Sequence, residues 1–255
     1  MRKRVLCLLV ASLLIPASSA FAANITFFVS NAYTTVVADV VPGFEARTGH
    51  KVDVQNGTSA SLSKRILGGD AFDLIVLTPT EDLQPIADAG FIVPSSIRGL
   101  AKGYLGMGVK AGAPHPKIDT VDQFKEALLN AHKISYTDPA SGGLSGVYMA
   151  ELFKRLNIED KLIKKDSLLP LRPLDAPESL LSGKADLSLQ QVAVLMVPGI
   201  EIVGPLPGEL QYYFTRSGAI SSKSKNPEAA KLLLEALSSK ETKALLPSKG
   251  MMPID

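Results

Sequence analysis

The sequence Ile25-Thr26-Phe27-Phe28-Val29, followed by Ser30-Asn31-Ala32-Tyr33, decides the fold. Its first five residues are β-branched or aromatic, as is typical of a buried strand. Apolar residues then recur every three to four positions, which predicts a helix: Val36, Val37, Val40, Val41 and Phe44. Because the free N–H groups at the start of a helix carry a partial positive charge, this turn predicts a place where an anion binds.

Two further strand ends repeat this pattern. Residues 51–55 predict a strand, and Gly57-Thr58-Ser59-Ala60-Ser61 leads from it into a second helix. The apolar run 72–77 predicts a third strand that is covered on both faces and ends at Thr78-Pro79-Thr80, where the threonines also suit helix capping. The carboxyl ends of parallel strands meet at one edge of a sheet. The candidate ligand-binding residues at this edge are Ser30, Asn31, Thr58, Ser59 and Thr78.

A second group of strands and helices follows residues 90–103, which are rich in Pro, Ser and Gly. A strand is predicted at 104–110, then a helix at 121–131, a strand at 133–137, a Gly/Ser loop at 138–146 and a helix at 147–156. A short strand at 171–174 and a helix at 177–182 precede a strand at 185–189 that ends at Gln190-Gln191. A return strand is predicted at 211–215, and the last helices, 227–237 and 241–246, are expected to pack on the first group.

This order predicts an α/β fold with two parallel-sheet lobes and a hinge. Residues 23–104 and 208–255 would form lobe I, and residues 105–207 would form lobe II. The Gly/Ser loop and the strand end of lobe II add Ser145, Gln190 and Gln191 to the candidate ligand-binding residues.

The first 22 of the 255 residues have the pattern of a secretory signal peptide. Arg2, Lys3 and Arg4 precede an apolar run at 8–15, and Ala20-Phe21-Ala22 is a cleavage signature. A periplasmic location with cleavage near Ala22 is therefore predicted. The chain's one cysteine, Cys7, lies in this segment, so the mature protein is expected to have no disulfide.

Composition and motifs exclude several classes of function. Without the three signal-peptide cations, the mature chain has 24 Lys and Arg against 25 Asp and Glu, which leaves no electrostatic footprint for nucleic acid. There is no phosphate loop, dinucleotide fingerprint or Gly-x-Ser-x-Gly elbow. His50, His115 and His132 lack the spacing of a metal site, so neither a metal nor another cofactor is expected.

Several short motifs resemble, in order and spacing, the periplasmic molybdate-binding proteins of ABC transporters, a family with the two-lobed type II binding fold. The motifs are Ile25-Thr26-Phe27-Phe28, Ser59-Ala60-Ser61-Leu62 with Arg65-Ile66 and Gly69, Asp73-Leu74-Ile75, Thr137-Asp138-Pro139 with Gly146-Val147-Tyr148, and Gly183-Lys184-Ala185-Asp186-Leu187. The resemblance covers essentially all of the mature chain. It implies a monomer that closes over an anion with hydroxyls and backbone N–H groups, and an ABC permease as partner.

The chain departs from the pattern of that family at two of three side-chain donors. Ser59 is kept, whereas the serine expected at the first turn falls on Ala32 and the expected tyrosine falls on Gln191. A buried donor without a partner costs roughly 1–3 kcal/mol, which argues against the same tetrahedral oxyanion. Amides donate and accept, so Asn31, Gln190 and Gln191 would suit an organic ligand with carboxylate and hydroxyl groups.

Charged residues near the predicted cleft allow a functional or a structural interpretation. Arg172 would either clamp a ligand carboxylate or lie on the surface of a short strand. Lys64 and Arg65 suit a solvated helix face, and Asp138 suits a turn before Pro139.

Three functions follow from these residues. The first is a periplasmic receptor for a small anion, an organic polycarboxylate in preference to a molybdate-type oxyanion. The second is an enzyme, aconitate isomerase, an activity found on a chain similar to this family, which interconverts cis- and trans-aconitate by allylic proton transfer and needs a base. The sequence leaves that base open among Tyr33, Lys64, Asp138, Asp175 and Tyr213. The third is an oxyanion receptor whose donors have moved, for example to Ser30.

Overall fold

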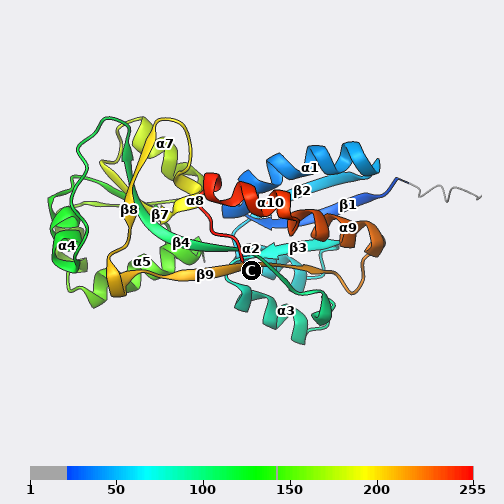
Figure 1. Ribbon diagram of the computed structural model, residues 1–255. Coiled ribbons are helices and arrows are strands. Elements are labelled where there is room, and N and C mark those ends of the chain that lie inside the picture. The colour runs from blue at the N-terminus through cyan, green and yellow to red at the C-terminus, as the bar shows by residue number, and fades with distance from the viewer. Residues whose placement is uncertain (1–21, 142, 255) are drawn as a thin grey trace, which may run out of the picture.

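The computed structural model describes residues 22–141 and 143–254. The predicted signal peptide, with Cys7, lies outside the described residues except for Ala22. Two groups of helices and strands lie next to each other and are joined by the long strands β4 (Arg98–Lys110) and β9 (Tyr213–Ile220) (Figure 1). Within the described ranges, no helix has the length and apolarity needed to cross a membrane.

The first group is built on a sheet with the strand order β2-β1-β3-β9-β4. Its parallel strands are β2 (Lys51–Gly57), β1 (Asn24–Ser30) and β3 (Leu74–Leu77), and β9 runs antiparallel to β3. The register pairs Ser30 with Gly57 and Val29 with Val76, so the strand ends with candidate site residues meet at one edge.

Helices cover both faces of this sheet. Residues of α1 (Thr34–Thr48) and α9 (Pro227–Leu237) pack into the hydrophobic core on one face. Helix α10 (Lys240–Leu245) lies beside α1. Residues of α2 (Ser59–Leu67) and α3 (Gln84–Asp88) pack into the hydrophobic core on the other face. Apolar side chains on both faces explain why β1 and β3 read as nearly continuous apolar runs.

The second group is built on the strand order β4-β7-β5-β6, with β8 also paired to β4. Its strands are β5 (Ile134–Thr137), β6 (Leu168–Leu171), β7 (Leu187–Gln191) and β8 (Ile200–Pro205). Its helices are α4 (Val121–Asn130), α5 (Leu144–Arg155), α6 (Glu159–Lys164), α7 (Ala176–Leu181) and α8 (Val192–Leu195). Strand β5 is parallel to β6 and β7.

Short 3-10 helices connect several of these elements. They are η1 (Asn31–Tyr33), η2 (Thr80–Leu83), η3 (Pro94–Ser96), η4 (Pro139–Ser141), η5 (Pro173–Asp175), η6 (Gly208–Leu210) and η7 (Leu246–Lys249).

Strand β4 changes its partners along its length. Residues 98–104 pair with β9, whereas Leu105 and the residues after it pair with β7 and β8. The chain returns where Tyr213 pairs with Tyr104. These registers support the proposed division into lobe I (residues 23–104 and 208–255) and lobe II (residues 105–207), and the two names are used in this sense below.

The structure corrects several predicted boundaries. Strand β4 begins at Arg98 and not at residue 104, because its first half pairs with β9. Helix α5 begins at Leu144 and not at residue 147, because Gly146, one of the residues that suggested a loop, packs inside its first turn. A Cβ on Gly146 would lie 2.4 Å from the Thr137 carbonyl oxygen, so only glycine permits this approach to β5.

A third correction concerns the strand predicted at 171–174. Strand β6 covers Leu168–Leu171 instead, and η5 follows it. Pro170 lies inside β6, at the edge of the sheet where a strand accepts proline, whereas Pro173 begins η5.

Candidate ligand-binding site

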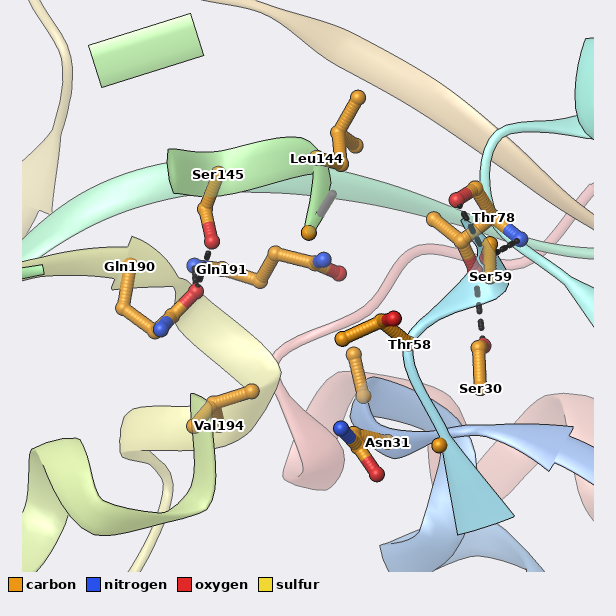
Figure 2. Close-up of a pocket in the computed structure, with 13 residues that line it drawn as sticks. Ser30, Asn31, Thr58, Ser59, Thr78, Leu144, Ser145, Gln190, Gln191 and Val194 are labelled. Atoms are coloured by element: carbon orange, nitrogen blue, oxygen red, sulfur yellow. Dashed lines mark hydrogen bonds between the residues drawn. The ribbon is translucent and has the colours of Figure 1, made fainter. Parts of the chain in front are cut away.

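A cleft between the two lobes contains eight of the nine predicted site residues. Its cavity volume is about 30 Å³. Lobe I contributes Ser30, Asn31, Ala32, Gly57, Thr58, Ser59 and Thr78, and lobe II contributes Gly143, Leu144, Ser145, Gln190, Gln191 and Val194 (Figure 2).

On the lobe I side, hydroxyl groups tie three strand ends together. The Ser59 hydroxyl donates to the Thr78 carbonyl oxygen at 2.8 Å and accepts from the Thr78 N–H at 3.0 Å. The hydroxyls of Ser30 and Thr78 lie 3.1 Å apart. Ser59 therefore fixes the start of α2 against the end of β3, and its hydroxyl is already bonded within the protein.

The helix starts at the cleft follow from local sequence. Thr58 is the N-cap of α2, and its hydroxyl oxygen accepts from the Ser61 N–H at 3.2 Å. Asn31 begins η1, and its side-chain oxygen accepts from the Asn56 amide at 2.8 Å, which leaves its own NH₂ group as a donor. These two elements bring N–H groups to the cleft without a charged side chain.

On the lobe II side, Ser145, Thr137 and Gln190 form a closed network. The Ser145 hydroxyl donates to Gln190 Oε1, and Gln190 Nε2 donates to Thr137 Oγ1 at 2.6 Å. The hydroxyls of Thr137 and Ser145 are 2.9 Å apart, and Gln190 Oε1 also accepts from the Gln191 N–H at 2.9 Å. Gln190 is fully buried and holds α5 against β7, so its amide is occupied by the protein itself.

Gln191 lies in front of a buried cation. Its side chain extends into the space between the two lobes (Figure 2), and its Oε1 accepts from Arg216 Nη2 at 2.7 Å. Arg216, on β9, has no exposed surface, and its Cζ is 4.9 Å from the centre of the Phe214 ring. Burial lowers the pKa of Arg216 to about 10, against an opposing effect of Tyr33, so the guanidinium is charged at pH 7.

Sequence reasoning missed Arg216 because the return strand was predicted to end at Thr215. Strand β9 continues to Ile220, and Arg216 lies in its middle. The available signal was a lone arginine within a segment whose flanking residues suit a buried strand.

Arg172, predicted as a possible clamp for a carboxylate, lies outside the cleft. Its side chain is 84% exposed and donates to both carboxylate oxygens of Asp175, at 2.8 Å and 3.2 Å. The clamp interpretation is wrong because β6 ends at Leu171, before Arg172, and the following turn η5 brings Asp175 to it. The arginine is the surface residue of the alternative interpretation.

The five candidate bases are also absent from the described lining of the cleft. Burial raises the pKa of Tyr33 well above its ordinary value, although Arg216 opposes this, so Tyr33 is protonated at neutral pH. Asp138 accepts from the Ala140 N–H at 2.9 Å, as a turn residue does. Asp175 bonds Arg172, and Tyr213 is half exposed.

Besides the bond from Arg216 of lobe I to Gln191 of lobe II, a further hydrogen bond joins the two lobes at the cleft. The Thr58 hydroxyl of lobe I donates to the Ser141 carbonyl oxygen of lobe II at 3.0 Å. The structure therefore shows the lobes in contact at the cleft. Across the described ranges, no group of three or more His, Cys, Asp or Glu side chains is arranged to hold a metal ion.

Comparison with known proteins identifies the family. Residues 25–252 match the model of the bacterial extracellular solute-binding proteins. An aconitate isomerase from a Pseudomonas species is 31% identical over 238 residues, which cover 91% of this chain and 88% of that protein.

Solved structures show the same fold. The periplasmic molybdate-binding protein of Azotobacter vinelandii superposes with a TM-score of 0.76 at 17% identity, over 91% of this chain and 100% of that chain. The sulfate-binding protein of Mycobacterium tuberculosis gives 0.68 at 18% identity, over 91% and 88%. The predicted two-lobed α/β fold and the predicted resemblance are confirmed, and the chain belongs to the family of bacterial extracellular solute-binding proteins.

Proposed function

We propose that the protein binds a small organic anion with carboxylate groups in the cleft between its lobes, as the periplasmic receptor of an ABC transporter. The observation that carries this proposal is the lining of the cleft. Its thirteen described residues offer hydroxyls, amides and backbone N–H groups, and none has a charged side chain. No carboxylate in this lining repels an anion.

Two helices begin at the cleft, one in each lobe. Gly57, Thr58 and Ser59 lead into α2, and Gly143, Leu144 and Ser145 lead into α5. Helix starts of this kind favour anions through free N–H groups and the helix dipole. An anion between them would therefore contact both lobes at once.

The amides favour an organic anion over a tetrahedral oxyanion. Asn31 and Gln191 lie where the resemblance would place hydroxyl donors or close to them, and the NH₂ group of each donates without charge. The identity with an aconitate isomerase, whose name specifies a tricarboxylate, points to the same class of ligand.

The cavity between the lobes is small for the proposed ligand. A cavity needs roughly 10–15 Å³ to hold one water, so about 30 Å³ holds about two. A polycarboxylate needs more room, and we expect the lobes to separate and the Thr58 to Ser141 hydrogen bond to break when it binds.

A thermal-shift panel on the mature chain tests the proposal. A ligand that binds only the folded state raises the melting temperature. We expect citrate and cis-aconitate to raise it, and molybdate to raise it less or not at all. Stabilisation by molybdate alone would contradict the proposal and favour an oxyanion receptor with moved donors.

The 31% identity favours isomerisation of aconitate as a second candidate function. Allylic proton transfer requires a base within hydrogen-bond reach of the substrate carbon. None of the five candidate bases is among the described residues that line the cleft, and this observation ranks the receptor first.

Proton NMR of cis-aconitate in deuterated buffer separates the two functions. Formation of trans-aconitate at a rate proportional to protein concentration would establish the isomerase. Stabilisation by cis-aconitate without conversion would establish the receptor.

A further inference from the structure

Arg216 is the largest fully buried side chain of the described protein, and its charge is not balanced. A guanidinium has five N–H donors, but among the described residues only Nη2 has a partner, the side-chain oxygen of Gln191. Nε and Nη1 have no hydrogen-bond partner among the described residues. The ring of Phe214 lies beside the guanidinium. Tyr33, whose hydroxyl is also buried without a hydrogen-bond partner among the described residues, opposes the lowering of the Arg216 pKa by burial.

A buried arginine without a carboxylate partner contributes little to the stability of a fold. A cation taken out of water without a carboxylate costs several kcal/mol, and replacing buried charges by apolar residues often stabilises proteins. The backbone nevertheless makes room for Arg216, because a Cβ on Gly103 would lie 2.1 Å from Nη1. Packing alone does not explain an arginine at this position.

The hydrogen bond to Arg216 fixes the orientation of the Gln191 amide. A guanidinium only donates, so the amide oxygen must face it and cannot turn toward a ligand. The NH₂ group of Gln191 is then the part of the amide that a ligand in the cleft can meet. A ligand with acceptor oxygens and negative charge suits both this donor and the cation behind it.

We propose that Arg216 makes the cleft selective for anions, as a positioning residue that acts through Gln191. This inference rests on the proposed function, because it names the source of positive charge for a site whose own lining is neutral. The buried position strengthens the effect of the charge, since solvent screens it little.

The first test replaces the cation. We expect Arg216→Met to weaken citrate or cis-aconitate binding by about tenfold or more in isothermal titration calorimetry, while the melting temperature stays the same or rises. Arg216→Lys keeps a charge and should recover part of the affinity. Arg98→Met is the matched control, because Arg98 lies exposed on β4 in the same sheet and changes the net charge equally.

A second variant tests the proposal without enlarging a cavity. Gln191→Glu places a carboxylate against Arg216 and balances its charge. We expect it to raise the melting temperature and to weaken citrate binding by about tenfold or more. If Arg216→Met does not fold, Arg216→Lys decides the matter. We expect it to bind citrate more weakly than the wild type, whereas a role of Arg216 in folding alone would leave the citrate affinity of the folded Arg216→Lys variant unchanged.

The outcomes separate this inference from the proposed function. If the wild-type protein binds neither citrate nor cis-aconitate, both are overturned. If the wild type binds and the Arg216 and Gln191 variants bind equally well, the inference is overturned and the proposed function stands. A lower melting temperature with unchanged affinity would show a structural role only.

Discussion

Polar residues at the cleft divide into those that hold the protein together and those with donors left for a ligand. Ser59 and Gln190 bond protein groups on either side of the cleft, and both are buried. Asn31 and Gln191 use their oxygens within the protein and keep their NH₂ groups. The NH₂ groups of Asn31 and Gln191 are therefore expected to determine which ligands bind.

The stability of Ser59→Ala tests the first group. This substitution removes both hydrogen bonds to Thr78 and leaves a buried N–H and carbonyl without that partner. We expect a loss of about 1–2 kcal/mol in the free energy of unfolding, measured by urea denaturation. Ser63→Ala in the same helix is the control. Equal stability of the wild type and Ser59→Ala would show that the hydroxyl does not hold the strand ends.

Asp82 on η2 gives a prediction about pH. Burial raises the pKa of Asp82 to about 6, and the negative charge of Glu81 adds to this. Between the ordinary aspartate pKa near 4 and about 6, the folded protein holds a proton that the unfolded chain has released. The contribution of Asp82 to stability therefore falls as pH rises through this range.

The melting temperature of Asp82→Asn measures this contribution. We expect the variant to melt higher than the wild type at pH 7.5, and the difference to shrink toward pH 4. Asp119→Asn, at an exposed aspartate, should show no such trend. A wild-type advantage at pH 7.5 would contradict the pKa assignment.

The sequence predicted most of the cleft because strand ends are local features. Ser30 and Thr58 each lie between a strand and a helix start, and Ser145 lies in the first turn of a helix; the parallel order brings such strand ends together. Arg172 was offered as a clamp and Arg216 was missed, because the burial of a charged side chain depends on the partners that a strand finds in three dimensions. A local pattern contains no information about those partners.

At the scale of elements, the start of α5 depends on its approach to β5. Gly146 lies in the first turn of α5, and its missing side chain lets the helix reach the end of the strand. The sequence predicted a loop here because glycine favours loops on average, whereas tertiary packing selected a helix.

Gly146→Ala tests this packing. The added Cβ would meet the Thr137 backbone at 2.4 Å, so the helix start must move. We expect a loss of about 1–3 kcal/mol in the free energy of unfolding and weaker citrate binding, since Ser145 moves with the helix. Gly204→Ala is the control, because its nearest new contact, Ile118 Cδ1 at 3.6 Å, is ordinary. If Gly146→Ala equalled this control, α5 would not require the close approach.

At the scale of the whole molecule, the cleft lies between two separate hydrophobic cores. The core of lobe II contains β7 and α5, and that of lobe I contains β1 and α1. Strands β4 and β9 connect them, and Ala193 of α8 packs into the core of lobe I. The sequence predicted this arrangement from the order of its elements, but not the contact of α8, which the sequence pattern does not show.

Binding in the cleft is best tested by calorimetric titration of the wild-type protein with citrate and cis-aconitate, in parallel with variants that lack one donor from each lobe. We expect one ligand per chain, and weaker binding in both Asn31→Ala of lobe I and Gln191→Leu of lobe II. Binding that neither variant weakens would place the ligand outside the cleft. If the folded wild-type protein bound neither carboxylate, the cleft would not be a site for organic anions of this class.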